Sequence, residues 1–281
     1  MAAKLDGKTI LVTGATNGIG LIAARELAQM GAHTIIASRD AQRCAAAVES
    51  IKRETGNTEV EYIAADLATR DGVQRAAHEF KKRHTRLDVL LNNAGALFMQ
   101  RRLSADGIEM TFALNHLNYF HLTILLLDVL KTSGASRVIN VSSMAHQGAR
   151  INFDDLQFEK NYQGMTAYGQ SKLANVLFTY ELARKLEGTR VTANALHPGF
   201  VNTGFAKNNN WIVKAGMALL RPIQRSPEKG AQTSIHLAAS SELDGVTGKY
   251  FVDSKAVPSD PASYNRASAE RLWQISLEMI A

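Results

Sequence analysis

The chain has 281 residues, of which 46% are hydrophobic and 21% are charged, a composition that excludes a disordered or low-complexity protein. The formal net charge of +6 would suit an anionic partner. The Lys and Arg residues are scattered in short groups, however, so we expect no nucleic-acid binding. Cys44 is the single cysteine, which excludes an internal disulfide and fits a reducing compartment.

No segment resembles a targeting or membrane-spanning sequence. Residues 1–8 lack the apolar run of a signal peptide. The longest apolar run, 122–127, contains Thr123 and is far too short to cross a bilayer. We therefore expect a cytoplasmic protein without a membrane anchor.

Short apolar, β-branched runs alternate along the chain with longer segments of helical periodicity. The predicted strands are residues 9–13, 34–38, 60–65, 87–91, 137–141, 191–195 and 249–252. The predicted helices are residues 18–30, 41–55, 70–83, 166–187, 227–240 and 267–280, with a long helix within 106–131. Continuously apolar strands that alternate with helices indicate a parallel sheet covered on both faces. The sequence thus predicts an α/β fold with a doubly wound, Rossmann-like sheet.

No Pro-, Ser- or Gly-rich linker interrupts this alternation, so we expect a single domain over residues 1–281. The least regular region is 200–226. Long irregular loops of this kind either cover a site or are surface excursions. We interpret 200–226 as a candidate substrate lid.

A glycine-rich turn joins the first predicted strand to the first predicted helix, with the spacing G-x₃-G-x-G. Glycines allow backbone to approach a pyrophosphate closely, and the helix N-terminus supplies N–H groups and partial positive charge. The turn therefore predicts a dinucleotide site contacted by Gly14, Thr16, Asn17, Gly18, Ile19 and Gly20.

The end of the second predicted strand bears on the choice of cofactor. Arg39 lies where a guanidinium would suit a 2′-phosphate, and Arg43 follows one helical turn later. This favours NADP(H). The alternative is that Asp40 reaches the ribose hydroxyls and Arg39 is a surface residue, which would give NAD(H).

Small and polar residues also follow the other predicted strands. In an open α/β sheet, ligands bind at the carboxyl ends of the strands, so we expect these residues to lie together. Turn chemistry alone would explain any one of them. As a group they extend the cofactor site to Asp66, Leu67, Asn93, Ala94, Gly95, Pro198, Gly199, Val201 and Thr203.

Tyr168 and Lys172 stand four residues apart in a segment of helical pattern, which places both side chains on one helix face. A free tyrosine has a pKa near 10 and is a poor proton shuttle at neutral pH. A nearby cation favours the phenolate and is expected to lower the pKa of Tyr168. The pair is a candidate acid/base, although many solvated helices carry Tyr and Lys at this spacing.

Together these segments strongly resemble the short-chain dehydrogenase/reductase family, over nearly the whole chain. The glycine turn, the segment 92–95, Ser143, the Tyr168/Lys172 pair and Pro198-Gly199 carry the resemblance. The segments 112–117, 140–143, 171–178 and 197–199 are most similar to the retinol dehydrogenase branch. The resemblance implies a hydride transfer between NADP(H) or NAD(H) and a carbonyl or alcohol, with an apolar aldehyde or ketone as the expected substrate.

The resemblance also implies roles for matched residues. Tyr168 would be the acid/base, and Lys172 would bind the nicotinamide ribose. Ser143 would hold the substrate oxygen, and Asn115 would anchor a water that leads protons to Lys172. The glycine turn, Asp66 and the segment 93–95 would line the cofactor from pyrophosphate to adenosine, and Pro198, Gly199, Val201 and Thr203 would border the nicotinamide.

The sequence leaves two alternatives for the oligomeric state and two for the function. Residues 147–165 form an insertion relative to compact members of the family, which leaves a monomer or a homodimer as the expected state. A non-catalytic, cofactor-sensing interaction protein on the same fold is the alternative function. His116, His121 and His146 show no metal-ligand spacing, so we expect no metal.

Overall fold

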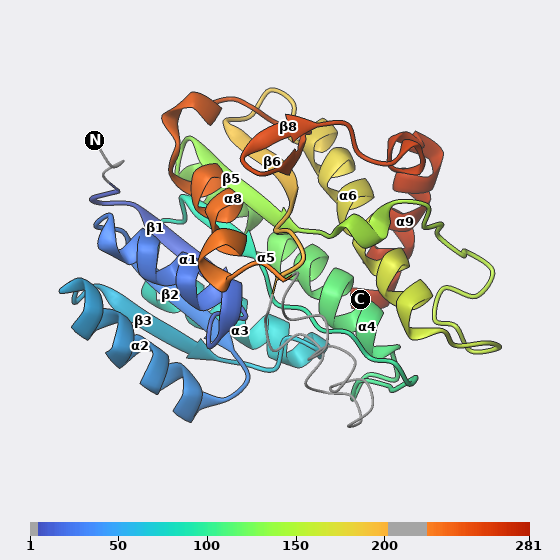
Figure 1. The fold of residues 1–281 in the computed structure, drawn as a ribbon, viewed down its shortest axis with the longest axis horizontal. Coiled ribbons are helices and arrows are strands. Elements are labelled where there is room, and N and C mark those ends of the chain that lie inside the picture. The colour runs from blue at the N-terminus through green and yellow to red at the C-terminus, as the bar shows by residue number, and fades with distance from the viewer. Residues whose placement is uncertain (1–4, 202–223) are drawn as a thin grey trace.

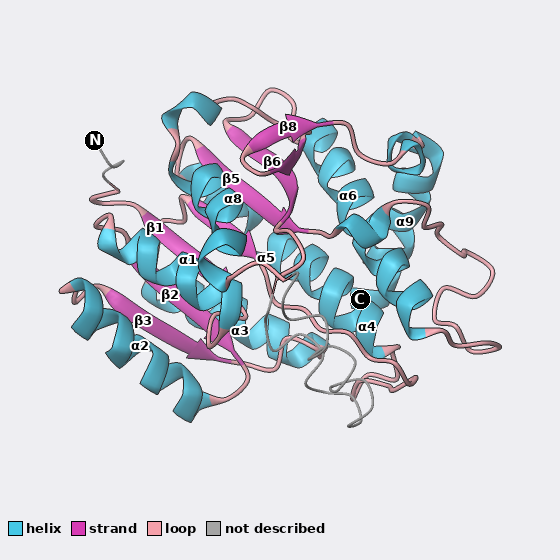
Figure 2. Cartoon of the chain, in the orientation of Figure 1, coloured by secondary structure: helices cyan, strands magenta, loops and turns pink. Residues whose placement is uncertain are grey.

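The computed structural model describes residues 5–201 and 224–281. Its centre is an 8-stranded sheet with the order β3-β2-β1-β4-β5-β6-β7-β8 (Figure 2). The strands are β1 Thr9–Thr13, β2 His33–Ser38, β3 Val60–Ala64, β4 Val89–Asn92, β5 Ser136–Val141, β6 Val191–His197, β7 Tyr250–Val252 and β8 Lys255–Val257. Neighbouring strands pair in parallel from β3 to β7, and β8 pairs with β7 in the antiparallel direction.

Helices cover both faces of the sheet, which confirms the predicted Rossmann-like fold. One face carries α1 Gly18–Gln29, α2 Ala41–Thr55 and α8 Pro227–Ala239, and α1 and α8 lie in front of the sheet in Figure 1. The other carries α3 Arg70–Arg83, α5 Asn118–Thr132 and α6 Gly164–Lys185, with α9 Arg266–Ile280 packed on α6. Within the described ranges, no helix combines the length and apolar character needed to cross a membrane.

Each face of the sheet has its own hydrophobic core. Leu11 on β1 packs in one core with Phe80 of α3 and Phe120 of α5. Its neighbour Val12 packs in the other core, with Ala24 of α1. Successive side chains of a strand point to opposite faces, so a strand buried on both sides favours apolar residues at consecutive positions. β1 is buried at every position, which explains the consecutive apolar residues Ile10, Leu11 and Val12.

Two elements differ from the predicted pattern. The long helix predicted within 106–131 begins as a short α4, Met110–Phe112, and then widens into a π-helical turn, Ala113–Leu117, before α5. A single π turn inserts without disturbing the hydrophobic periodicity on either side, so the pattern does not reveal it. The missed strand β8 is three exposed residues long and forms a hairpin with β7.

The strand order fixes where a ligand can bind. The chain passes from β3 at one edge back to β4 beside β1, so the loops after β1 and β4 diverge to opposite faces. Such a switch point leaves a crevice at the carboxyl ends of the two strands. The glycine turn after β1 and the segment 93–95 after β4 both lie there.

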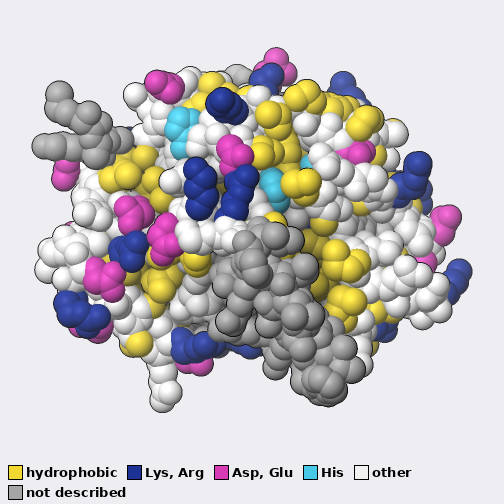
Figure 3. Space-filling model, in the orientation of Figure 1, with side chains coloured by type: hydrophobic (Ala, Val, Ile, Leu, Met, Phe, Trp, Pro, Cys, Tyr) yellow, Lys and Arg dark blue, Asp and Glu magenta, His cyan; other side chains and the backbone are white. Residues whose placement is uncertain are grey.

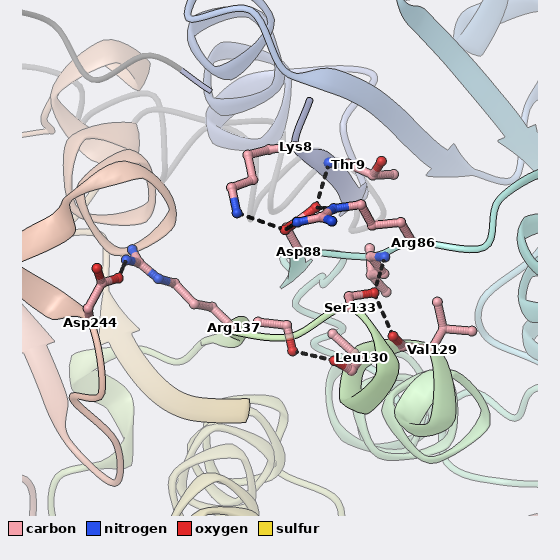
Figure 4. A network of polar contacts seen from close by, with 11 residues as sticks. Lys8, Thr9, Arg86, Asp88, Val129, Leu130, Ser133, Arg137 and Asp244 are labelled. Carbon is pink, nitrogen blue, oxygen red and sulfur yellow. Dashed lines mark hydrogen bonds and ion pairs between the residues drawn. The ribbon is translucent and has the colours of Figure 1, made fainter. Parts of the chain in front are cut away.

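The opposite, amino-terminal end of the sheet is held by a buried carboxylate (Figure 4). Asp88 is 3% exposed and accepts hydrogen bonds from Lys8 Nζ at 3.0 Å and from the backbone N–H of Thr9 at 3.0 Å. Arg86 donates to both of its carboxylate oxygens, at 2.7 and 2.6 Å. Burial opposes ionisation of Asp88, but these donors outweigh it and lower the pKa of the carboxyl.

We predict that Asp88→Ala lowers the free energy of unfolding by roughly 1–3 kcal/mol, because it leaves the Thr9 N–H without its acceptor. The pKa of Asp88 is lower in the folded protein. Its stabilisation is therefore complete above the unfolded pKa near 3.9 and is lost as the pH falls through the folded value. Urea unfolding at neutral and acid pH measures both effects.

The control is Asp244→Ala, which removes an exposed partner of Arg137 in the same region and should change the free energy of unfolding by less than about 1 kcal/mol. Equal losses for the two variants would contradict the role given to Asp88.

Candidate active site

The glycine turn has a backbone that only glycine can adopt without strain. Gly14 has a φ of +68°, and a Cβ placed on it would lie 2.7 Å from the Cα of Ala94. A Cβ on Gly20 would lie 2.7 Å from the carbonyl oxygen of Gly14. The turn is therefore packed directly against the segment after β4.

Asn93 and Thr13 brace this turn. Asn93 Nδ2 donates to the carbonyl oxygen of Thr13 at 2.8 Å. The Thr13 hydroxyl in return accepts the backbone N–H groups of Asn93 and Ala94, at 2.9 and 3.0 Å. The sequence pattern by itself indicates no role for Thr13. Its only signal is its position as the last residue of β1, directly before the first glycine.

The start of α1 suits an anionic group. Asn17 occupies the N-cap position, but its side chain makes no capping hydrogen bond, and the first turn contains no acidic residue. The first N–H groups of the helix thus keep their partial positive charge for another acceptor. A diphosphate fits this donor set, and Thr16, Gly18 and Ile19 are only partly buried around it.

At the end of β2, Arg39 and Asp40 have different surroundings. Asp40 caps α2, because its Oδ1 accepts the backbone N–H of Arg43 at 3.1 Å. Arg39 is exposed, and its side chain makes no hydrogen bond or ion pair with the described part of the chain. At the end of β3, Asp66 is exposed and Leu67 is buried. Of the two charged side chains after β2, only the Arg39 guanidinium has no hydrogen-bond or ion-pair partner among the described residues.

Asn115 lies in the π-helical turn and is fully buried. Its Oδ1 accepts the N–H of Ala96 at 2.9 Å, and its Nδ2 donates to the carbonyl of Ala96 at 3.0 Å. The same Nδ2 lies 3.1 Å from the hydroxyl of Ser171 on α6. Asn115 thereby joins the segment after β4 to the helix that carries Tyr168 and Lys172.

The other three predicted catalytic residues also meet. Lys172 is 3% exposed, and its Nζ donates to the carbonyl oxygen of Val141 at 3.0 Å. The same Nζ lies 5.6 Å from the ring centroid of Tyr168. A hydrogen bond joins the side chains of Tyr168 and Ser143. A Cβ on Gly95 would lie 3.0 Å from Asn115 Oδ1 and 3.6 Å from Lys172 Nζ, so this glycine lies directly beside both side chains.

The pKa values differ from the prediction made from spacing. Burial raises the pKa of Tyr168 above its usual value, although the hydrogen bond to Ser143 opposes the change. Burial lowers the pKa of Lys172 to about 7. The expected lowering of the Tyr168 pKa is therefore wrong, because desolvation penalises the charged forms of both groups.

Asn175, one turn after Lys172, is a further member of the site. Its Nδ2 donates to the backbone carbonyl of Asn115 at 2.9 Å and lies 3.4 Å from the carbonyl of Val141, which also accepts from Lys172. The signal that could have revealed it is the i, i+3 spacing from Lys172, which puts both residues on one helix face.

The last segment of the predicted site follows β6. Pro198 and Gly199 are partly buried, and Gly199 has a φ of +91°. Val201 is buried and forms a bridge with Arg225, whose N–H donates to the carbonyl of Phe200 at 2.7 Å. Thr203 and most of the proposed lid 200–226 lie outside the described residues. The two described ends of that segment are hydrogen-bonded to each other.

We predict that Gly14→Ala destabilises the protein and also weakens dinucleotide binding, because the new Cβ would displace Ala94. Gly56→Ala is a matched control, since Gly56 has a φ of +72° and a Cβ added there would meet no atom within 4 Å. The control should cost about 1 kcal/mol of backbone strain, and Gly14→Ala should cost roughly 1–3 kcal/mol more. Chemical unfolding of both variants makes the comparison, and equal costs would refute the close contact.

The chain is similar to curated dehydrogenases over almost its whole length. It is 42% identical over 277 residues to mouse (Mus musculus) retinol dehydrogenase 12, a match that covers 99% of this chain and 87% of that protein. It is 43% identical over 279 residues to human polyprenol dehydrogenase, with 97% and 84% covered.

Solved structures agree. A protein from Mycobacterium paratuberculosis matches with a TM-score of 0.81 and 32% identity, over 99% of this chain and 95% of that one. The NADP complex of RhlG from Pseudomonas aeruginosa matches with a TM-score of 0.70 and 28% identity, over 92% and 98%. The short chain dehydrogenase family model matches residues 8–214. The chain therefore belongs to the short-chain dehydrogenase family of oxidoreductases.

Proposed function

We propose that this protein transfers a hydride between NADP(H) and an apolar aldehyde, ketone or alcohol. The observation that carries the proposal is the hydrogen-bonded juxtaposition of Ser143 and Tyr168, with Lys172 beside the Tyr168 ring, at the carboxyl edge of the sheet. Asn115 connects this group to the crevice beside the glycine turn. The arrangement puts an acid/base next to the position that a dinucleotide held by that turn would reach.

The chain's own residues supply proton transfer and orientation. When bound, the nicotinamide supplies the hydride to the carbonyl carbon. Negative charge then develops on the carbonyl oxygen, and the hydroxyl of Ser143 stabilises it by donating a hydrogen bond. Tyr168 gives its phenolic proton to that oxygen, which completes the alcohol. In the oxidative direction, the Tyr168 phenolate takes the proton from the alcohol and becomes the phenol again.

Lys172 is proposed to set the charge of this group. With a pKa of about 7, its amine changes protonation state near neutral pH. Hydroxyl acceptors of a bound ribose would favour the ammonium form, and the ammonium would favour the Tyr168 phenolate. The lowering of the Tyr168 pKa that the sequence predicted would thus apply when a dinucleotide is bound. Asn175 and Asn115 hydrogen-bond to backbone carbonyls of this site.

The residues that follow β2 favour NADP(H) over NAD(H). Asp40 is engaged in capping α2, whereas the Arg39 guanidinium is exposed and has no partner in the described chain. A free guanidinium suits the 2′-phosphate that distinguishes NADP(H). One structural relative at 28% identity is itself an NADP complex.

Apolar residues around the site support an apolar substrate. Met144 follows Ser143 and is 56% exposed, Met165 precedes Tyr168 by three residues and is 55% exposed, and Phe200 is 42% exposed. Large exposed apolar side chains beside a site favour hydrophobic ligands. The relatives are named for retinol and polyprenol, which are long apolar alcohols.

We further infer a single catalytic domain over residues 1–281, with the segment 200–226 acting as the substrate lid. The hydrogen bond from the Arg225 N–H to the Phe200 carbonyl holds the two described ends of this segment next to each other.

Two other functions have less support. A cofactor-sensing protein without activity would not need all four residues of the group. A nucleic-acid binder would need a basic surface, whereas basic and acidic side chains intermingle on the face in Figure 3.

We predict that Tyr168→Phe lowers turnover of aldehydes and ketones at least about 100-fold, because it removes the proton donor. NADPH affinity should stay within about 2-fold, since the ring remains. Steady-state kinetics and a fluorescence titration measure the two quantities. Tyr62→Phe, on β3, is the control and should leave both unchanged. Full turnover by Tyr168→Phe would rule out the proposed acid/base.

We predict that Arg39→Ser weakens NADPH binding at least about 10-fold and leaves NADH binding nearly unchanged, because a charge-assisted hydrogen bond contributes about 1.5–3 kcal/mol. Arg53→Ser, at the other end of α2, removes the same charge far from the strand end. Parallel titrations with both cofactors test this. An equal loss for NADPH and NADH would place Arg39 outside the 2′-phosphate site.

A further inference from the structure

Three side chains with metal-ligating atoms meet at the amino-terminal end of β2 and β3, away from the site described above. His33 is the first residue of β2, Glu61 lies in β3, and His84 follows the last turn of α3. One ligand atom from each lies within 4.8 Å of the other two. All three side chains are partly or largely buried.

The hydrogen bonds of this group leave one nitrogen unused. His33 Nε2 lies 2.6 Å from Glu61 Oε1, but His84 Nε2 is 3.7 Å from Glu61 Oε2, beyond hydrogen-bond range. The His84 side chain is only 8% exposed, and its Nε2 has no hydrogen-bond partner within the described chain.

We propose that His33, Glu61 and His84 form a binding site for Zn²⁺. Two imidazoles and one carboxylate are a known zinc donor set, and water would complete the tetrahedron. Bonds of about 2.0–2.2 Å in a tetrahedron put ligand atoms roughly 3.3 Å apart. The separations of 2.6 and 3.7 Å run to different oxygens of Glu61, and all three ligand atoms lie within 4.8 Å of one another, so the side chains would have to rotate to bind one ion.

Arg83 competes with this site, because its Nη1 lies 3.0 Å from Glu61 Oε2. Its guanidinium also contacts the carbonyl oxygens of Glu79, at 3.2 Å, and Tyr62, at 3.3 Å. Arg83 therefore keeps acceptors if Glu61 turns to a metal. A plain ion-pair cluster would explain His33, Glu61 and Arg83, but it would leave the buried His84 Nε2 unsatisfied, at an energetic cost.

The position of the cluster predicts a structural role. His33 and Ser38 are the two ends of β2, so the cluster is about 17 Å from the cofactor edge at roughly 3.3 Å per residue. A bound ion would join β2, β3 and the end of α3. Its loss should therefore lower stability without changing the chemistry proposed for Tyr168.

The test is equilibrium dialysis of the full-length chain, with any affinity tag removed, against Zn²⁺. We expect one bound equivalent in the wild type and at least a 10-fold weaker affinity in His84→Asn. His78→Asn is the matched control, because His78 is an exposed histidine on the same helix. It should bind as the wild type does. His33→Asn repeats the test at a less buried ligand.

Two further readouts identify the site. Co²⁺ should give the visible absorption of a tetrahedral site in the wild type and in His78→Asn, and none in His84→Asn. Zn²⁺ should raise the melting temperature of the wild type and of His78→Asn, but not that of His84→Asn. Turnover of His84→Asn should equal that of the wild type, which separates this proposal from the proposed function. Absence of binding by the wild type, or wild-type binding by both His84→Asn and His33→Asn, would overturn the site.

Discussion

The hydrogen bonds of the Asn115 side chain hold the two halves of the site in one arrangement. On one side they pair with both backbone groups of Ala96, just after β4, and on the other they reach Ser171 on α6. A side-chain amide can satisfy donors and acceptors together, and the π turn presents it at full burial. Asn175 then fixes the backbone carbonyl of the same residue. The crevice and the Tyr168/Lys172 helix therefore keep one relative position.

The site also buries ionisable side chains, which an ordinary apolar core does not contain. Lys172 is buried with a hydrogen bond to a backbone carbonyl, and Tyr168 is buried beside it. Desolvation moves the pKa values of both groups toward their neutral forms. Such local departures from the rules of stable packing are expected at functional sites, because a bound ligand supplies the missing partners.

The polar groups at the two ends of β1 and its neighbouring strands have different contacts. At the amino end, charges are paired, as the contacts of Asp88 with Lys8 and Arg86 show (Figure 4). At the carboxyl end, glycine backbone, an uncapped helix start and an Arg39 without a partner among the described residues leave donors and positive charge available. For these residues, the paired charges lie at the amino end of the strands and the available donors at the carboxyl end.

Local patterns determined much of this protein from sequence alone. The strand–helix alternation, the glycine turn and the i, i+4 spacing of Tyr168 and Lys172 depend on neighbours in the chain. The fold and most of the candidate site could therefore be predicted from them. The tertiary structure decided the rest: the π turn at Asn115, the roles of Thr13 and Asn175, and the cluster of His33, Glu61 and His84. It also decided the direction of the Tyr168 pKa. The physical reason is that burial and contacts between distant segments arise only when the chain is packed, and no spacing records them.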